Sequence, residues 1–248
     1  MDTKTREDLF QEIDRLAPEY VQLWKELCLR EGRSDEIENL NRVADLIVER
    51  AEAIGLTVER EHFPGAGDPL FLTLPEKRAE DGQPVCGEFT SEAGPVSLLG
   101  HFDTVHPTGT FGTPAVTERD GKFFGPGVHD MKGGIALALF ICDVLKRSGL
   151  PHREIRLVFD PDEESGEHLG ENRKDFHLRR TKGSVAAINC ESGVTGKITV
   201  GRKGVLRVAI DVTGIAGHAG IRYFQSASAV REAAYKILAL EIDRKSVV

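Results

Sequence analysis

The chain has 248 residues and a formal net charge of −8 at pH 7, and 40% of its residues are hydrophobic. This size and apolar content support a substantial core, while the acidity argues against nucleic-acid partners and against an anionic membrane surface. No apolar stretch approaches the ~20 residues that cross a bilayer, and the charged N-terminus lacks the apolar region of a secretory signal, so we expect a cytoplasmic protein.

Helical periodicity marks the first part of the chain. Apolar residues recur at helical spacing over residues 9–16 and 21–28, and Pro18 lies between them, so we expect two helices. A long amphipathic helix is expected next. Asp35 is a plausible N-cap for it, and Gly55 is suited to end it.

The middle of the chain alternates between strand and helix patterns. Residues 56–63 resemble a strand, and residues 64–94 resemble a hairpin or an irregular connection with a short apolar island at 70–74. A helix is expected over 133–147. Three short apolar runs have the length of buried strands: 96–99, 155–159 and 185–188. This order predicts an α/β fold with helices on both faces of a mixed, mostly parallel sheet.

The pattern changes again near the end of the chain. Two strand-like segments, 197–200 and 205–212, precede a helix-like segment over 226–244, which together predict the start of a smaller α+β domain. We place the domain boundary between residues 1–202 and 203–248, because the strand ends that carry candidate ligands lie before it.

Residues able to bind a metal ion follow predicted strands or lie in turns. His101 follows the run 96–100, and Asp103 can face the same side and orient the imidazole. Asp130 lies in the glycine-rich segment 125–134 at the entry to a helix, where glycine permits a tight turn. Each residue also has a simpler interpretation: a loop histidine, a turn-capping Asp103 and an N-cap Asp130.

Carboxylates gather after the next two strands. Four of them fall within five positions: Asp160, Asp162, Glu163 and Glu164. Such crowding is costly unless cations or protons compensate for it, although a solvated acidic loop is the simpler interpretation. Glu191 follows another strand, where a lone glutamate is usually exposed. Together with His101 and Asp130, these carboxylates match a hydrolytic centre that holds two cations.

Five motifs carry a family resemblance. They are His101-Phe102-Asp103-Thr104-Val105, Asp130-Met131-Lys132-Gly133-Gly134, Asp162-Glu163-Glu164-Ser165-Gly166, Glu191-Ser192-Gly193 and Gly217-His218-Ala219-Gly220. Together they resemble the M20 family of zinc metallopeptidases and deacylases, which includes glutamate carboxypeptidase, succinyl-diaminopimelate desuccinylase, acetylornithine deacetylase and aminoacylase. The resemblance extends over roughly residues 35–244, in the family's order and approximate spacing.

The resemblance implies a zinc-peptidase-like catalytic domain with two Zn²⁺ ions, which Co²⁺ or Mn²⁺ could replace. His101 and Glu191 would bind one ion. Glu164 would bind the other, and Asp130 would bridge both. A glutamate at position 191 is more similar to the carboxypeptidase and deacylase branches than to the aminopeptidases.

The resemblance also implies catalytic roles. Asp103 would orient His101. Glu163 would act as the general base, taking a proton from a metal-bridging water and passing it to the leaving nitrogen. His218 would lie in a lid or dimerisation domain and stabilise the oxyanion in the active site of the other subunit of a homodimer. Without the resemblance, His218 would be a loop histidine between glycines.

The family's chain returns from the lid to the catalytic domain and supplies a final histidine ligand. This chain ends inside the predicted lid, so we expect one complete metal position, half of a second and an exposed sheet edge. We therefore interpret the sequence as a fragment of a longer protein.

The leading hypothesis is a metal-dependent hydrolase of amide bonds in a small peptide or an N-acyl amino acid. The alternative is a truncated, non-catalytic metal-binding polypeptide with a structural or regulatory role. A metal-free α/β hydrolase is disfavoured, because the chain has no Gly-x-Ser-x-Gly elbow.

Overall fold

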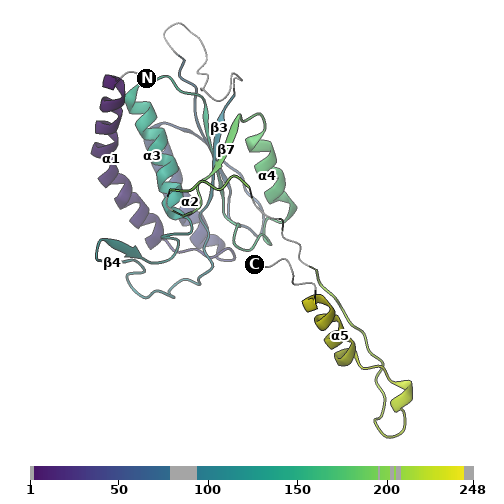
Figure 1. The fold of residues 1–248 in the computed structure, drawn as a ribbon. Coiled ribbons are helices and arrows are strands. Elements are labelled where there is room, and N and C mark those ends of the chain that lie inside the picture. The colour runs from purple at the N-terminus through teal and green to yellow at the C-terminus, as the bar shows by residue number, and fades with distance from the viewer. Residues whose placement is uncertain (1–2, 79–93, 195, 202–203, 205–207, 243–248) are drawn as a thin grey trace. The chain divides into compact units, whose positions relative to one another are not determined.

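The computed structural model describes residues 3–78, 94–194, 196–201, 204 and 208–242 (Figure 1). The chain divides into two compact units, Met1–Lys197 and Ile198–Val248. Among the described residues, the first unit holds all the strands and all the side chains of the buried core. The assignment of the two parts as a catalytic domain and a lid stays a prediction.

A mixed sheet of five strands forms the centre of the first unit. The strands are β1 (Thr57–Arg60), β2 (Leu70–Leu74), β3 (Val96–His101), β6 (Ile155–Asp160) and β7 (Ala186–Asn189). Their order is β1-β2-β6-β3-β7. The neighbours β6, β3 and β7 are parallel, whereas β1 and β2 join by antiparallel pairing. The predicted mixed sheet is confirmed, and its parallel part places His101 beside Asp160.

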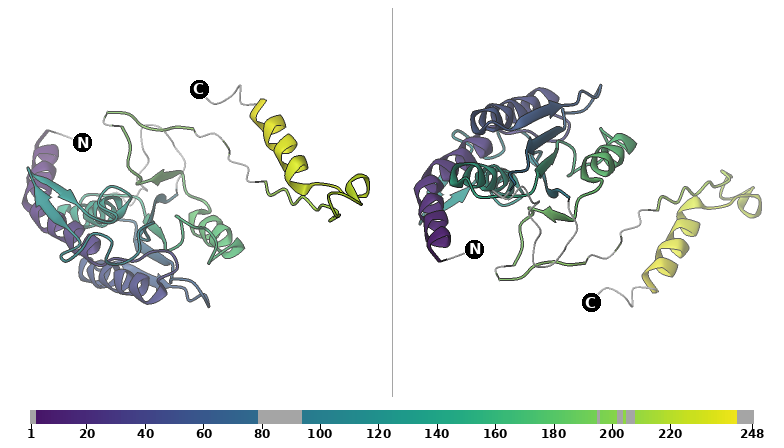
Figure 2. Two further views of the ribbon diagram at one scale, coloured as in Figure 1. Left: turned by 90° about the horizontal axis from the view of Figure 1, so that it is seen from below. Right: turned by 90° about the horizontal axis from the view of Figure 1, so that it is seen from above.

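Helices cover both faces of this sheet, as Figures 1 and 2 show. They are α1 (Thr3–Leu29), α2 (Ile37–Ile54), α3 (Lys132–Ser148) and α4 (Glu171–Thr181). The first three share one hydrophobic core with the sheet, while α4 covers the other face, where Phe176 packs with Phe71 and Val158. None of the helices in the described part of the chain is both long and apolar enough to cross a membrane.

The prediction of two N-terminal helices is wrong, because α1 is continuous through Pro18. Proline removes one helical hydrogen bond and crowds the preceding turn. However, Leu16, Tyr20 and Leu23 are almost fully buried on both sides of the proline. Packing of one continuous apolar face therefore keeps the helix intact across it.

One of the two predicted ends of α2 is confirmed, and the other is wrong. Gly55 ends the helix as predicted, in a left-handed conformation with φ of 83°, and its N–H donates to the carbonyl of Ala51. The N-cap residue is Glu36 rather than the predicted Asp35. The carboxylate of Asp35 instead pairs with Arg33, so it is not available to cap the helix.

Four elements, three strands and one helix, are not assigned from the sequence pattern. The apolar island at 70–74 forms β2, which is largely buried between β1 and β6. The hairpin of β4 (Thr117–Arg119) and β5 (Lys122–Phe124) has strands of three mostly exposed residues. Helix α4 buries only Phe176. The strands β4 and β5 and the helix α4 show little hydrophobic periodicity, which is the signal that sequence reasoning uses.

The second unit contains the short 3₁₀ helix η1 (Tyr223–Gln225) and α5 (Ala229–Ile242), which confirms the predicted helix. The predicted strands are wrong where they can be compared: residues 197–200 and 208–212 form no strand, and residues 205–207 lie outside the described residues. A strand needs a partner for its backbone groups. The described residues of this unit supply one isolated bridge, between Ile215 and Ala227.

Phe176→Ala tests how α4 is attached to the sheet. We expect the free energy of unfolding to fall by ~3 kcal/mol, because the ring is 1% exposed and its removal leaves a cavity against Phe71 and Val158. Urea denaturation measures this change. Leu178→Ala is the matched control, since Leu178 on the same helix is 62% exposed. Equal effects of the two variants would contradict this account of α4.

Candidate metal centre

The candidate ligands converge at one edge of the sheet. His101 is the last residue of β3, Glu191 follows β7, and Asp130 lies in the turn that leads into α3. Glu163 and Glu164 follow β6. Because the carboxyl ends of parallel strands meet at one edge of a sheet, residues that are far apart in the sequence come together there.

The imidazole of His101 is the point on which the carboxylates converge. Its Nε2 lies 3.1 Å from Asp130 Oδ1, 3.2 Å from Glu191 Oε1 and 4.0 Å from Glu163 Oε2. The His101 side chain is 2% exposed. A shielded imidazole among carboxylates is a donor set that suits zinc and also accepts cobalt or manganese.

Two overlapping groups in the described chain have the spacing of metal ligands. One is His101, Asp130 and Glu164, and the other is His101, Glu163 and Glu191; within each group the ligand atoms lie within 4.8 Å of one another. The structure thus brings together the four residues predicted as ligands and the predicted base. The position of Glu163 is compatible with metal binding as well as with proton transfer.

Asp103 ties these groups together through a carboxylate that is fully buried. One oxygen lies 3.1 Å from His101 Nδ1 and accepts the backbone N–H of Glu163 at 3.2 Å. The other oxygen accepts the Ser34 hydroxyl at 2.7 Å and the backbone N–H of Glu164 at 3.1 Å. With its Nδ1 proton donated to Asp103, His101 directs Nε2 toward the carboxylates.

Ser34 is a residue of this centre that sequence reasoning missed. It lies between α1 and α2, more than sixty residues before Asp103, and no motif includes it. The local sequence does not predict this contact. A serine shortly before a helix suggests an N-cap and not a hydrogen bond to a distant carboxylate. Its 4% exposure and its hydroxyl contact appear only in the folded chain.

Small residues let α3 approach the strand ends closely. A Cβ on Gly134 would overlap the carbonyl oxygen of Cys190, the residue before Glu191. A Cβ on Gly100 would lie 2.8 Å from Cε of Met131. The Gly134 contact is with backbone, so this glycine limits the separation between the start of α3 and the segment that carries Glu191, whereas at Gly100 the Met131 side chain can move aside.

Lys132 anchors the start of α3. Its ammonium group is fully buried and donates to the carbonyl of Arg30 at 2.7 Å, which joins the helix to the end of α1. Burial lowers the pKa of Lys132 to about 8. This lysine follows the candidate ligand Asp130 by two residues, so the same contact also restrains the turn.

The crowded negative charge of the centre raises the pKa values of several of its groups. Burial alone would lower the pKa of His101, but the hydrogen bond and charge of Asp103, together with the charges of Glu191 and Glu163, raise it to about 9. Burial and the charge of Asp130 raise the pKa values of Glu164 and Glu191. Without a cation, the centre therefore retains protons to offset its carboxylates.

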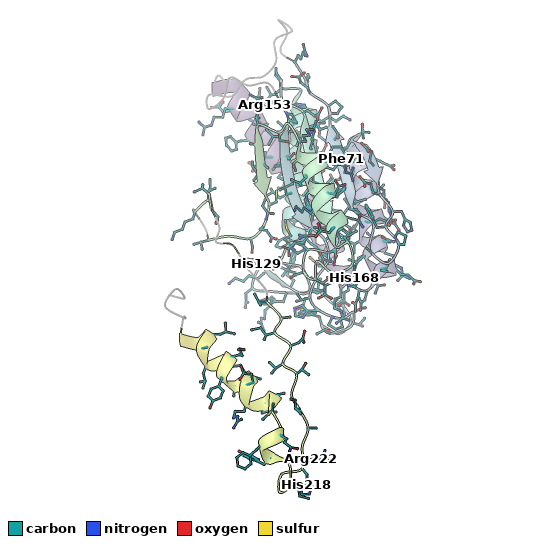
Figure 3. The ribbon with its side chains drawn as sticks, turned by 90° about the vertical axis from the view of Figure 1, so that its right-hand side faces the viewer. Phe71, His129, Arg153, His168, His218 and Arg222 are labelled. Atoms are coloured by element: carbon teal, nitrogen blue, oxygen red, sulfur yellow. The ribbon has the colours of Figure 1, made fainter. Side chains whose placement is uncertain are left out.

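Figure 3 shows the two ends of the first unit. His129, in the glycine-rich turn, and His168 lie toward the end that holds the centre, whereas Arg153 lies at the opposite end. His218 belongs to the second unit, where its Nδ1 accepts the N–H of Gly220 at 3.1 Å. The predicted catalytic role of His218 stays a prediction, because the residue lies outside the unit that contains the ligands.

The sequence was compared with models of protein families. The model of "Peptidase family M20/M25/M40" matches residues 97–243, more than half of the chain. The chain belongs to this family. The matched segment contains every residue predicted as a metal ligand, together with Asp103, Glu163 and His218.

Individual relatives of this M20 chain have less than 30% sequence identity to it in the two comparisons that follow. Carboxypeptidase G2 of Pseudomonas sp. (strain RS-16) is 26% identical over 96% of this chain and 55% of its own length. Succinyl-diaminopimelate desuccinylase of Rickettsia canadensis (strain McKiel) is 29% identical over 50% of this chain and 35% of its own length. The M20 chain therefore spans about half the length, or less, of these curated relatives.

A solved structure agrees on the fold. Aminopeptidase PepT from Bacillus cereus ATCC 10987 has a TM-score of 0.62 and 22% sequence identity, over 91% of this chain and 56% of that chain. The mixed sheet and covering helices of the M20 chain thus have a counterpart in a peptidase structure.

Ser34→Ala tests whether the Ser34 hydroxyl supports the centre through Asp103. We expect zinc affinity to fall about 10-fold, because removing a partner of a ligand-orienting carboxylate weakens metal binding on this scale. Competition with a chromophoric chelator measures the affinity. Ser97→Ala is the control, since Ser97 is also buried and loses a hydroxyl contact of 2.8 Å, to Ser184, at the far end of β3. A similar loss in both variants would contradict a specific role for Ser34.

In the metal-free chain, the contribution of His101 to stability should fall as the pH rises from about 6.5 through about 9. His101 has its pKa raised from 6.5 to about 9, so its protonated form stabilises the fold fully below pH 6.5, and this contribution is lost as the pH passes 9. The loss should not exceed ~3 kcal/mol. Urea denaturation in EDTA measures it across this range.

The variant His101→Asn is the control for this pH dependence, because asparagine can donate a hydrogen bond to Asp103 but does not titrate. The decline should be smaller in this variant. Lys132 contributes with the opposite sign, since its lowered pKa of about 8 makes the fold more stable as the pH rises above 8, and comparison with the variant removes this contribution. A stability difference between the parent chain and His101→Asn that does not change between pH 6.5 and 9 would show that the proton on His101 is not coupled to folding.

Proposed function

We propose that this M20 chain forms the metal-binding part of a hydrolase that cleaves amide bonds in small peptides or N-acyl amino acids. The observation that supports the proposal is the convergence of Asp130, Glu163 and Glu191 on Nε2 of the buried His101. Glu164 belongs to a second group with His101 and Asp130, whose potential ligand atoms lie within 4.8 Å of one another. Membership of a peptidase family agrees with this chemistry. The similarity to carboxypeptidase G2 and to a desuccinylase favours peptide or acyl-amino-acid substrates.

In this proposal, His101 and Glu191 hold one divalent ion, Glu164 holds a second, and Asp130 lies between them. Zinc is the proposed metal, with cobalt or manganese as substitutes. When bound, the metal would supply a Lewis acid that polarises the scissile carbonyl and acidifies water. Asp103 keeps the Nδ1 proton of His101 in place, so that Nε2 is free to be a ligand.

Glu163 is the proposed general base. Its backbone N–H is fixed by Asp103, while its side chain remains 43% exposed, compared with 17% for Glu191. An exposed carboxylate beside the ligands can take a proton from an attacking water and deliver it to the leaving nitrogen. The adjacent Glu164 shares the same backbone anchor, so the two side chains can divide metal binding and proton transfer between them.

The second unit would serve as the lid or dimerisation domain of a homodimer. In that arrangement His218 would stabilise the oxyanion of the substrate in the other subunit. A cytoplasmic location is proposed on the sequence grounds given above. The family match, which includes His218, supports the assignment of the lid.

Glu163→Gln tests whether Glu163 acts as the general base and not as a metal ligand. We expect turnover of an N-acyl glutamate to fall at least ~100-fold, because a general base contributes this much to hydrolysis, while zinc affinity stays within about 3-fold. Glu167→Gln is the control, since Glu167 is an exposed neighbour on the same loop. Turnover is measured with this chain and with the longest natural protein that contains it, because the chain spans 55% of carboxypeptidase G2.

Three results would contradict the proposal in different ways. Full turnover by the Glu163→Gln variant would exclude Glu163 as the base. A large loss of zinc affinity in this variant would make Glu163 a ligand instead. Stoichiometric zinc binding without hydrolysis in any form of the protein would support the non-catalytic alternative.

A further inference from the structure

A cavity of about 460 Å³ opens beside the candidate metal centre, and one of its walls is cationic. His101, Glu163 and Glu191 of the centre line one side of the cavity. The facing wall comes from α4 and consists of Arg173, Lys174 and His177. His177 is four residues after Arg173 and three after Lys174, so its side chain neighbours both of theirs on the helix surface.

Two of the three α4 residues already have a partner. Asp160, at the end of β6, is 1% exposed and forms an ion pair with Nε of Arg173. It also lies 2.9 Å from Nε2 of His177. The Arg173 guanidinium then extends toward Glu163, with Nη2 at 3.8 Å from Oε1. Arg173 is therefore held rigidly between a buried carboxylate and the candidate base.

Lys174 has no such partner. It lines the same cavity, yet no hydrogen bond or ion pair joins its side chain to any residue in the part of the chain that the structure describes. Asp160 offsets the charge of Arg173, and a divalent ion would offset the carboxylates at His101. Lys174 then contributes an exposed positive charge to the cavity that no ion pair within the described residues offsets, which is an arrangement that attracts an anion.

We propose that the α4 wall binds a carboxylate of the substrate, with Lys174 as the contact that discriminates by charge and Arg173 as its fixed neighbour. The proposal rests on the proposed hydrolase function and narrows its substrates to those that carry a carboxylate besides the group held at the metal centre. An acidic acyl group or an acidic side chain meets this requirement. A neutral isostere, such as the corresponding amide, fits the cavity but does not pair with Lys174.

The test measures binding and does not require turnover. Isothermal titration calorimetry gives the affinities of the zinc-loaded chain for succinate and glutarate, and for the monoamide of each. One carboxylate of either probe can reach the metal, which leaves the second end to report on the α4 wall. We expect the parent chain to bind the better dicarboxylate about 5-fold more tightly than its monoamide, the upper range for one exposed ion pair.

Lys174→Glu reverses the charge on the wall. We expect it to weaken dicarboxylate binding about 10-fold and monoamide binding by less than about 2-fold, because the attraction becomes a repulsion of similar size. Lys182→Glu is the matched control. Lys182 follows the same helix, is exposed and does not line the cavity, so this variant has the same net charge and should bind like the parent. Lys174→Met should give an intermediate loss.

The outcomes distinguish this proposal from the proposed function. If dicarboxylates and monoamides bind equally and Lys174→Glu changes nothing, the α4 wall is not a carboxylate site, and the hydrolase proposal is unaffected. If the two Lys→Glu variants weaken binding equally, the effect is long-range and the site is likewise overturned. A chain that binds the dicarboxylates with the expected charge dependence but hydrolyses no amide supports the site and contradicts the hydrolase.

Discussion

The centre depends on the buried carboxylate of Asp103. A carboxylate without contact with water is stable only when hydrogen bonds replace its hydration. Here, donors from three separate segments do so: the hydroxyl of Ser34, the imidazole of His101, and the backbone N–H groups of Glu163 and Glu164. The loop before α2, the end of β3 and the loop after β6 are thereby fixed to one pair of oxygen atoms.

This arrangement explains how flexible side chains can be placed reproducibly around one imidazole. A glutamate side chain has several rotatable bonds, so its position depends on how well its backbone is held. Asp103 holds the backbone of both glutamates and the ring of His101. The approach of α3, permitted by Gly134 and anchored by Lys132, brings Asp130 to within 3.1 Å of His101.

The sequence predicts the parts of this protein that depend on local pattern. The strands β3, β6 and β7 and the helices α2 and α3 follow from hydrophobic periodicity, and the ligands follow from their positions after these elements. The resemblance to the M20 family predicts that His101, Asp130 and Glu191 are metal ligands, and the family model matches the segment that contains them. The mutual distances among these groups are contained in no single segment of the chain.

Local sequence patterns do not predict features that depend on contacts between residues far apart in the chain. The helix through Pro18 persists because residues on both sides pack against the core. The bond between Ser34 and Asp103 joins residues sixty-nine positions apart, and no periodicity predicts it. Helix α4 lacks a clear apolar face, so neither its existence nor the charged wall that it presents to the cavity is evident before the chain folds.

Electrostatic balance links the two functional proposals. At the centre, Nδ1 of His101 is committed to Asp103, so a proton on Nε2 is the only positive charge that the imidazole can direct at Asp130, Glu163 and Glu191. One proton cannot satisfy three carboxylates, whereas a divalent ion accepts several oxygen ligands at once. At α4, the buried Asp160 pairs with Arg173, while Lys174 forms no ion pair with any residue that the structure describes. A cation at the first site and an anion at the second would each relieve an imbalance, and a substrate carboxylate bound at α4 would lie in the same cavity as the candidate base.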